Sequence, residues 1–432
     1  MQAKGKVLVV VERFFPEDFL VNDLVAEWMR QGMEVEVLTQ VPSYPFDRIY
    51  DGYTNKRFQT TVEDLGGGEG PKVIVHRVST IFGYNRSVKR KILNYLHFGW
   101  RTMWWALWHG RRYERVFIYH TAALTMAMAA IPLRRIWRRP VAIWTQDLWP
   151  DAVWGYGFKP SRFREWLLNN FVRLIYAQCN RIAVSCPGYM ARIREICGQE
   201  AEFIPQWDLD SFAAPETGFA KKPEASRPLV FMFAGNLGVP QNLENDIDGF
   251  LQAELTGVEL WLVGGGVMLE PLKAKFGAKA DGRIRFCGRQ PRSQMRKWYA
   301  QADALIISLT DAYKLTLPGK FQSYLKTGKP LLGFISGATR LFIDGEPVPG
   351  VEVGESCGRL GWTAAPDEVD EIASSYRKLA ESIRNGQGNV FGENCRRLSE
   401  KLFERGKQIE RLRELMEFNA EKQRREEAER IQ

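Results

Sequence analysis

The segment Leu317–Pro330 reads LPGKFQSYLKTGKP and lies between two apolar runs, Ala304–Leu309 and Leu331–Ile335. Each run has the length and composition of a buried strand, so the pattern predicts one short helix between two strands. Pro318 suits the first turn of that helix and Gly328 suits its end. A helix that begins at the end of a parallel strand points unpaired N–H groups at the crevice where such sheets bind ligands.

Lys320 stands in the first turn of this predicted helix. A lysine there adds a full positive charge to the unpaired N–H groups, and together they outline an anion site. The alternative is an ordinary crossover helix whose lysine is solvated. The segment alone does not choose between these two interpretations.

Three further strands of the second half run into glycine-containing turns. They are Pro228–Ala234 before GNLG (Gly235–Gly238), Val258–Val263 before Gly264–Gly266, and Arg283–Phe286 before Cys287 and Gly288. Glycine lets the backbone come close to a ligand's phosphates or sugar, and each turn leads toward a helix. One such turn often serves only to reverse the chain, but their recurrence favours a ligand site.

The first half of the chain also alternates strands and helices. Val7–Val11, a helical pattern over Val21–Arg30 and a second strand at Val35–Thr39 form a βαβ unit. Further strands are expected at Val73–Val78, Val116–Tyr119, Val141–Thr145 and Arg181–Ser185. Near-continuous apolar strands are typical of a parallel sheet covered on both faces, so a doubly wound α/β domain is predicted.

His120 and Asp147 follow two of these strands, at the ends where open α/β sheets bind ligands. Both are therefore candidates to contact a substrate. His120 is equally compatible with an ordinary histidine, and Asp147 with a turn-capping residue. Glu17, in the loop after the first strand, is a weaker candidate on the same domain.

The length and composition of the chain narrow its organisation. A chain of 432 residues is too long for one ordinary core, so two domains are expected, with Gln206–Arg227 as a linker that lacks an apolar period. The formal charge of +9 indicates an anionic partner. The six cysteines are scattered without metal-ligand spacing, which predicts reduced thiols in a cytoplasmic protein and no metal site.

The segment 86–139 carries twelve Lys or Arg residues and a single acid, Glu114. Within it, the helical pattern Ile92–Trp108 places an apolar stripe on one face (Leu93, Leu96, Trp100, Met103, Trp104, Leu107). Basic clusters around a tryptophan-rich helix are typical of an element that lies in the headgroup region of an anionic bilayer. The alternative is that the stripe is core and the arginines are solvated. Nucleic acid is not expected as a partner, because no binding motif accompanies the charge.

Four motifs together resemble bacterial glycosyltransferase family 4: FFPEDFLVNDL, TQDLWPD (145–151), FAGNLG and LPGKFQSYLKTGKPLL. The branch most similar adds amino sugars such as N-acetylfucosamine to surface polysaccharides. The resemblance implies a GT-B fold, in which two Rossmann-like doubly wound α/β domains face each other across a cleft and a C-terminal helix returns to the first domain. It also implies a nucleotide-diphosphate sugar as co-substrate, with a UDP-sugar as the leading candidate, retention of anomeric configuration and no obligatory cofactor or metal.

The resemblance also assigns parts of the chain. It implies an N-terminal acceptor and membrane-facing domain (1–205), a linker (206–227), a C-terminal donor domain (228–395), a helix crossing back (396–418) and a charged tail (419–432). The catalytic candidates are Lys320, Asp147 and His120. The donor-binding candidates are Gly235, Asn236, Gly238, Gly265, Gly288, Lys320 and Ser323.

The sequence departs from the family pattern where glutamates usually stand, because Leu315 and Ser323 occupy those positions. A basic pair that often follows the first glycine turn is replaced by VPQNLEN (239–245). The leading hypothesis is a cytoplasmic enzyme, peripheral on the inner face of the plasma membrane, that transfers a sugar to a polyprenyl-linked glycan for a surface polysaccharide such as O-antigen. The alternatives are a non-catalytic partner subunit with the same fold and a nucleotide-sugar epimerase.

Overall fold

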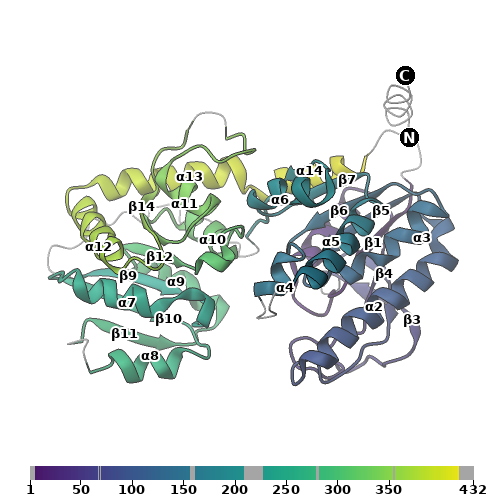
Figure 1. The fold of residues 1–432 in the computed structure, drawn as a ribbon, viewed down its shortest axis with the longest axis horizontal. Coiled ribbons are helices and arrows are strands. Elements are labelled where there is room, and N and C mark those ends of the chain that lie inside the picture. The colour runs from purple at the N-terminus through teal and green to yellow at the C-terminus, as the bar shows by residue number, and fades with distance from the viewer. Residues whose placement is uncertain are drawn as a thin grey trace. The chain divides into compact units, whose positions relative to one another are not determined.

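The computed structural model describes residues 5–66, 68, 70–155, 161–208, 227–278, 282–353 and 356–417 (Figure 1). The chain forms two compact units. Unit 1 contains the chain up to residue 185, residues 190–204 and the segment from 406, and unit 2 contains 186–189 and 205–405. The expected tail and most of the expected linker lie outside the described residues.

Unit 1 is built on an eight-stranded sheet in the order β3-β4-β2-β1-β5-β6-β7-β8. Its strands are β1 (Val7–Val11), β2 (Val35–Gln40), β3 (Phe58–Asp64), β4 (Lys72–Val78), β5 (Arg115–His120), β6 (Val141–Thr145), β7 (Arg181–Val184) and β8 (Glu202–Phe203). All neighbouring strands are parallel except β3 and β4. Every residue of β1 and β6 is buried, as expected for strands covered on both faces.

The helices that belong to unit 1 include one from the far end of the sequence. They are α1 (Leu20–Arg30), α2 (Val88–His109), α3 (Ala130–Arg135), α4 (Asp151–Gly155), α5 (Arg162–Tyr176), most of α6 (Gly188–Cys197) and α14 (Arg405–Met416). Ile409 and Leu412 of α14 are fully buried, and the carbonyl of Ile409 accepts a hydrogen bond from Trp28 Nε1 at 3.4 Å. The expected return of a C-terminal helix to the first domain is thus confirmed.

Unit 2 is built on a six-stranded parallel sheet in the order β11-β10-β9-β12-β13-β14. Its strands are β9 (Leu229–Ala234), β10 (Val258–Val263), β11 (Ile284–Gly288), β12 (Ala304–Ser308), β13 (Leu331–Phe334) and β14 (Gly361–Ala364). Its helices are α7 (Leu243–Gln252), α8 (Leu269–Phe276), α9 (Met295–Gln301), α10 (Gly319–Thr327), α11 (Ala338–Asp344), α12 (Val369–Arg384) and α13 (Gln387–Leu402). Both units are therefore Rossmann-like, as predicted.

The structure differs from the sequence-based expectation at two kinds of place. Strands β3, β8 and β14 were not expected, because β3 is an edge strand with mixed polar composition, β8 has only 2 residues and β14 has only 4. The expected single helix over 396–418 is instead two helices, α13 and α14, separated at Phe403 and Glu404. Phe403 is fully buried, with its ring 5.9 Å from that of Phe321 in unit 2, and the chain enters unit 1 three residues later.

The strand order locates the ligand crevice of each sheet. In unit 2 the chain first adds strands on one side of β9 and then places β12 on its other side, so the order reverses between β9 and β12. In unit 1 the corresponding reversal lies between β1 and β5. Ligands of open α/β sheets bind outside the carboxyl ends of the strands at such a reversal.

Candidate functional site

Lys320 lies at the reversal point of unit 2, in the first turn of α10. As predicted, Pro318 precedes the helix and Gly328 ends it in the left-handed conformation, with φ 62°. The lysine Nζ is buried 3.6 Å from the centroid of the Phe233 ring. A Cβ atom built on Gly235 would stand only 3.0 Å from that Nζ. The ammonium group therefore lies against the first glycine turn, and it has no hydrogen-bond partner among the described residues.

Burial lowers the pKa of Lys320 to about 7, and the nearby carboxyl group of Asp246 opposes that shift. Asp246 is only 2% exposed, and its Oδ1 accepts a hydrogen bond from Ser308 Oγ at 3.0 Å. Burial raises the pKa of Asp246 well above its usual value. Sequence reasoning missed Asp246 and Ser308. The available signal was an acidic residue on the apolar face of α7, directly after the first glycine turn.

Backbone hydrogen bonds join the three glycine turns at the carboxyl ends of β9, β10 and β11. Gly235 N donates to Val263 O, and Gly264 N donates to Gly288 O, each at 2.9 Å. A Cβ on Gly264 would lie 1.8 Å from the carbonyl oxygen of Gly235, so the close packing of the turns requires glycine there. By contrast, a Cβ on Gly265 would meet nothing nearer than 3.5 Å. The three turns are thus packed together through their backbones, and the backbone at Gly265 is open to a ligand.

The remaining donor-binding candidates lie around this layer. Asn236 is exposed, and Gly238 N donates a hydrogen bond to Gln241 Oε1 at 3.1 Å. Gly288 has a φ of +66° and open space where a Cβ would stand. Ser323 lies on α10, half-buried, three residues after the lysine. All of these candidates belong to the same edge of unit 2 or to the helix that begins there.

His120 and Asp147 lie in unit 1, at the ends of the adjacent strands β5 and β6. His120 is completely buried; its Nδ1 lies 3.4 Å from Thr145 Oγ1, and its Nε2 has no partner among the described residues. Burial lowers the pKa of His120 to about 3, so the ring is neutral at physiological pH. Asp147 is half-buried, and its Oδ2 accepts a hydrogen bond from the amide of Ala122 at 2.7 Å.

A buried charged cluster at the end of β1 was largely missed by sequence reasoning. Arg13 is 7% exposed and donates to Ser43 Oγ at 2.9 Å, and Glu12 beside it is also buried. Glu17, the weaker sequence candidate, accepts hydrogen bonds from the amides of Ser43 at 2.7 Å and Tyr44 at 2.6 Å. Glu17 therefore holds the loop after β2. The missed signal was the charged pair that directly follows five consecutive valine and leucine residues.

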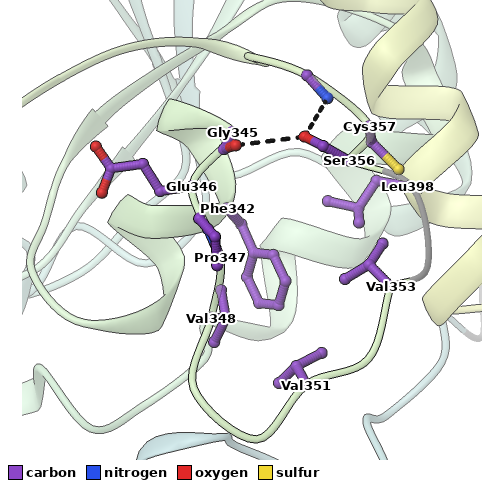
Figure 2. A pocket seen from close by; sticks show the side chains of 11 residues that line it. Phe342, Gly345, Glu346, Pro347, Val348, Val351, Val353, Ser356, Cys357 and Leu398 are labelled. Atoms are coloured by element: carbon purple, nitrogen blue, oxygen red, sulfur yellow. Dashed lines mark hydrogen bonds between the residues drawn. The ribbon is translucent and has the colours of Figure 1, made fainter.

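A separate pocket in unit 2 lacks the groups that an anion would need. It is lined mainly by apolar side chains of α11, the following loop and α13, such as Phe342, Val351 and Leu398 (Figure 2). No lysine or arginine lines it, and the carboxylate of Glu346 points away from the ring of Phe342. A phosphorylated ligand therefore fits the glycine turns and not this pocket.

Two kinds of element are absent from the described residues. No cluster of three or more His, Cys, Asp or Glu side chains in them is arranged to hold a metal ion. Likewise, no helix in the described ranges combines the length and apolar composition needed to cross a bilayer.

The chain has two doubly wound sheets that are parallel except for the β3–β4 pair, and each sheet carries candidate side chains at its reversal point. A C-terminal helix packs on the first unit. This arrangement defines a GT-B glycosyltransferase fold. Family models agree: residues 20–207 match the glycosyl transferase 4-like domain, and residues 228–382 match the glycosyl transferases group 1 domain. The chain therefore belongs to the GT-B glycosyltransferases, a class of transferase enzymes.

The individual relatives share low sequence identity with this chain. The probable glycosyltransferase WbjE of Pseudomonas aeruginosa is 22% identical over 254 residues, which cover 56% of this chain and 60% of that relative. Anabaena Alr3699/HepE, solved with UDP and glucose, superposes with a TM-score of 0.62 at 12% identity over 95% of this chain and 98% of its own. The lipopolysaccharide outer core galactosyltransferase WaaB superposes with a TM-score of 0.60 at 14% identity, over 94% of this chain and 98% of its own. At these identities the structural likeness shows the fold.

Proposed function

We propose that this protein transfers a sugar from a nucleotide-diphosphate sugar to a polyprenyl diphosphate-linked glycan during synthesis of a bacterial surface polysaccharide. The observation that carries the proposal is the buried Nζ of Lys320, which has no hydrogen-bond partner in the described residues and lies against the glycine turn of Gly235. A buried cation without a hydrogen-bonded partner costs stability, and an anionic ligand at this edge would offset that cost.

The donor diphosphate is proposed to bind between the glycine turns and the start of α10. Gly235, Asn236, Gly238, Gly265 and Gly288 bring backbone to it, and Lys320 supplies positive charge. Negative charge grows on the diphosphate as the glycosidic bond breaks, and the ammonium group and the N–H groups of the helix start stabilise that charge. Ser323, one turn further along α10, is proposed to contact the nucleoside. We propose UDP as the nucleotide, in line with the ligand of Alr3699/HepE.

Unit 1 is proposed to serve the transferred sugar and the acceptor. Asp147 is half-buried at the end of β6 and retains one carboxylate oxygen beyond its bond to Ala122. His120 offers a neutral ring whose Nε2 is unpaired in the described residues. The resemblance of the four motifs together to the amino-sugar branch supports an N-acetylated amino sugar, transferred with retention and without a metal.

The acceptor is proposed to be reached at the inner face of the plasma membrane, where α2 docks the protein. Four residues of the α2 stripe are exposed, Leu93 by 53%, Leu96 by 51%, Trp100 by 53% and Trp104 by 40%, and Met103 and Leu107 are half-buried. The apolar residues that pack into the core are instead Phe98 and Trp105, on the other side of the helix. An exposed apolar stripe flanked by arginines and lysines is typical of helices that lie in a membrane interface.

A thermal-shift panel with UDP, dTDP, GDP and ADP tests the donor site. A nucleotide at a hundred times its dissociation constant stabilises the fold by about 2.7 kcal/mol, so one member of the panel should raise the melting temperature clearly. In Lys320→Ala the ligand-induced shift, measured from that variant's own baseline, should shrink. No shift with any nucleotide would contradict the proposal and favour a non-catalytic partner subunit.

A further inference from the structure

A second pocket lies in unit 1 between the edge strand β3 and the C-terminal half of α2. It has a volume of about 420 Å³. Aromatic side chains form much of its wall: Phe58 from β3 and Trp104 and Trp108 from α2, exposed by 39%, 40% and 73%. Trp104 and Trp108 also belong to the exposed side of α2, so the pocket continues the apolar stripe at its C-terminal end.

The charge around this pocket is entirely positive. Arg57 and Arg112 line it, and no aspartate or glutamate does. Arg57 and Arg101 both hold their guanidinium carbons 5.7 Å from the centroid of the Phe58 ring. None of these three arginines forms an ion pair within the part of the chain that the structure describes. Like charges gathered without counter-ions are stable only where solvent or an anion neutralises them.

The two histidines of the pocket are already engaged by neighbouring side chains. His76 is held by Thr60 Oγ1 and by Glu36 Oε2, each at 2.9 Å, so the carboxylate of Glu36 is already engaged behind the pocket wall. His109 stacks on Trp105 with ring centroids 4.6 Å apart and stiffens the base of the pocket. The arginines in and beside the pocket are therefore the groups left for a ligand.

We propose that this pocket binds the phosphate headgroup of an anionic phospholipid, with Arg57, Arg101 and Arg112 around the phosphate and Trp104 and Trp108 at the level of the glycerol and upper acyl chains. The inference rests on the proposed membrane docking of α2. It assigns to that docking surface a site for the lipid headgroup. A planar guanidinium pairs with phosphate through two parallel hydrogen bonds, and indole rings favour the interfacial region of a bilayer. The combination of both in one pocket matches a lipid headgroup better than a soluble anion.

Co-sedimentation with vesicles tests this site. The full-length protein is mixed with phosphatidylcholine vesicles, or with vesicles that also contain phosphatidylglycerol. The compared variants are Arg57→Gln/Arg112→Gln, its charge-preserving counterpart Arg57→Lys/Arg112→Lys, and a matched control, Arg296→Gln/Lys297→Gln, which removes the same charge from α9 of unit 2. Each basic residue at an anionic surface changes partitioning by about fivefold, so the pocket glutamine variant should lose roughly 25-fold.

The expected result is a loss confined to phosphatidylglycerol vesicles, only partly restored in the lysine variant and much smaller in the control, because lysine keeps the charge but not the two parallel hydrogen bonds. Inorganic phosphate at millimolar concentration should not release the bound protein. Equal binding by the pocket variant and the control would overturn the inference while leaving membrane docking intact. Release by inorganic phosphate would identify a soluble anion as the ligand and would overturn the lipid assignment. Failure of the wild-type protein to bind any vesicle would contradict the docking proposal itself, and the nucleotide panel would still test the donor site separately.

Discussion

The Nζ atom of Lys320 lies 3.6 Å from the centroid of the Phe233 ring. A desolvated cation against an aromatic face gains about 2 kcal/mol, which offsets only part of the cost of burying an ammonium group. Asp246 nearby favours the charged form, yet burial still brings the lysine pKa down to about 7. The fold alone therefore does not satisfy this cation.

Replacing Lys320 by methionine should therefore stabilise the protein without ligand. Methionine has a similar length and no charge to bury, and exchanging buried charge for apolar packing commonly adds about 1–4 kcal/mol. Urea denaturation at pH 7 measures the change in the free energy of unfolding. A destabilised Lys320→Met would mean that the ammonium group has a structural partner and is not held for a ligand.

The pH dependence of stability should carry the signature of His120. Its folded-state pKa of about 3 lies below the ordinary value of 6.5, so the unfolded chain binds the proton more readily. The contribution of this ring to stability is therefore complete above pH 6.5 and is lost as the pH falls toward 3. Between pH 6 and 4 it accounts for about 1.4 kcal/mol per pH unit.

His120→Gln keeps a polar side chain that does not titrate, and urea denaturation at pH 4, 5, 6 and 7 provides the comparison. The slope of unfolding free energy against pH should flatten by about that amount relative to the wild type. An unchanged slope would show that the histidine is protonated within the folded protein.

Two adjacent tryptophans of α2 should respond in opposite ways. Trp105 is 6% exposed and lies 4.7 Å from the ring of His76, so Trp105→Ser should cost about 3–5 kcal/mol of stability. Trp104 is 40% exposed, so Trp104→Ser should change stability by less than about 1 kcal/mol while weakening binding to anionic vesicles. Thermal unfolding and vesicle flotation of both variants measure the two effects. A large stability loss in Trp104→Ser would show that the stripe packs in the core and is not a membrane-binding surface.

The glycine turns offer a matched pair of substitutions. Gly264→Ala places a methyl group 1.8 Å from the carbonyl oxygen of Gly235 and should destabilise unit 2 by about 3 kcal/mol or more. Gly265→Ala meets no atom nearer than 3.5 Å, so it should cost no more than about 1 kcal/mol. If backbone at Gly265 approaches the donor phosphates, that variant will bind UDP more weakly despite its intact fold. Unchanged UDP affinity in Gly265→Ala would remove this residue from the donor site.

Much of the architecture follows from local pattern. The parallel strands of both sheets are apolar runs that end at glycine or polar residues, and their order along the chain already indicates two doubly wound domains. The edge strand β3 was not predicted because it reverses the usual apolar-inside pattern: Phe58 and Val62 are exposed, whereas Glu63 is buried. The break between α13 and α14 could not be predicted from the sequence. It depends on Phe403, which is buried against unit 2 by tertiary packing that no local pattern encodes.

The residues of the candidate site also fall into two groups, those indicated by local sequence signals and those that depend on tertiary packing. Lys320 was predictable, because helix-start chemistry and a strand end are both local signals. For Asp246 the local signal was only an acid on the apolar face of α7, because its significance depends on burial beside Ser308 of β12, 62 positions away in sequence. Gly264 and Gly265 look alike in sequence, and only the packing of neighbouring turns separates a steric requirement from an accessible backbone.

Calorimetric titration of UDP at pH 8, repeated in buffers of different ionisation enthalpy, tests most directly whether Lys320 binds the donor diphosphate. With a pKa of about 7 the lysine is mostly neutral at pH 8 when no ligand is bound, and a bound diphosphate would raise that pKa. Wild-type protein should therefore take up close to one proton on binding, and its affinity should fall as the pH rises above 7. Lys320→Met should take up none and bind about ten- to a hundredfold more weakly. Binding without proton uptake in the wild type, together with equal affinity in Lys320→Met, would contradict a donor site at this lysine.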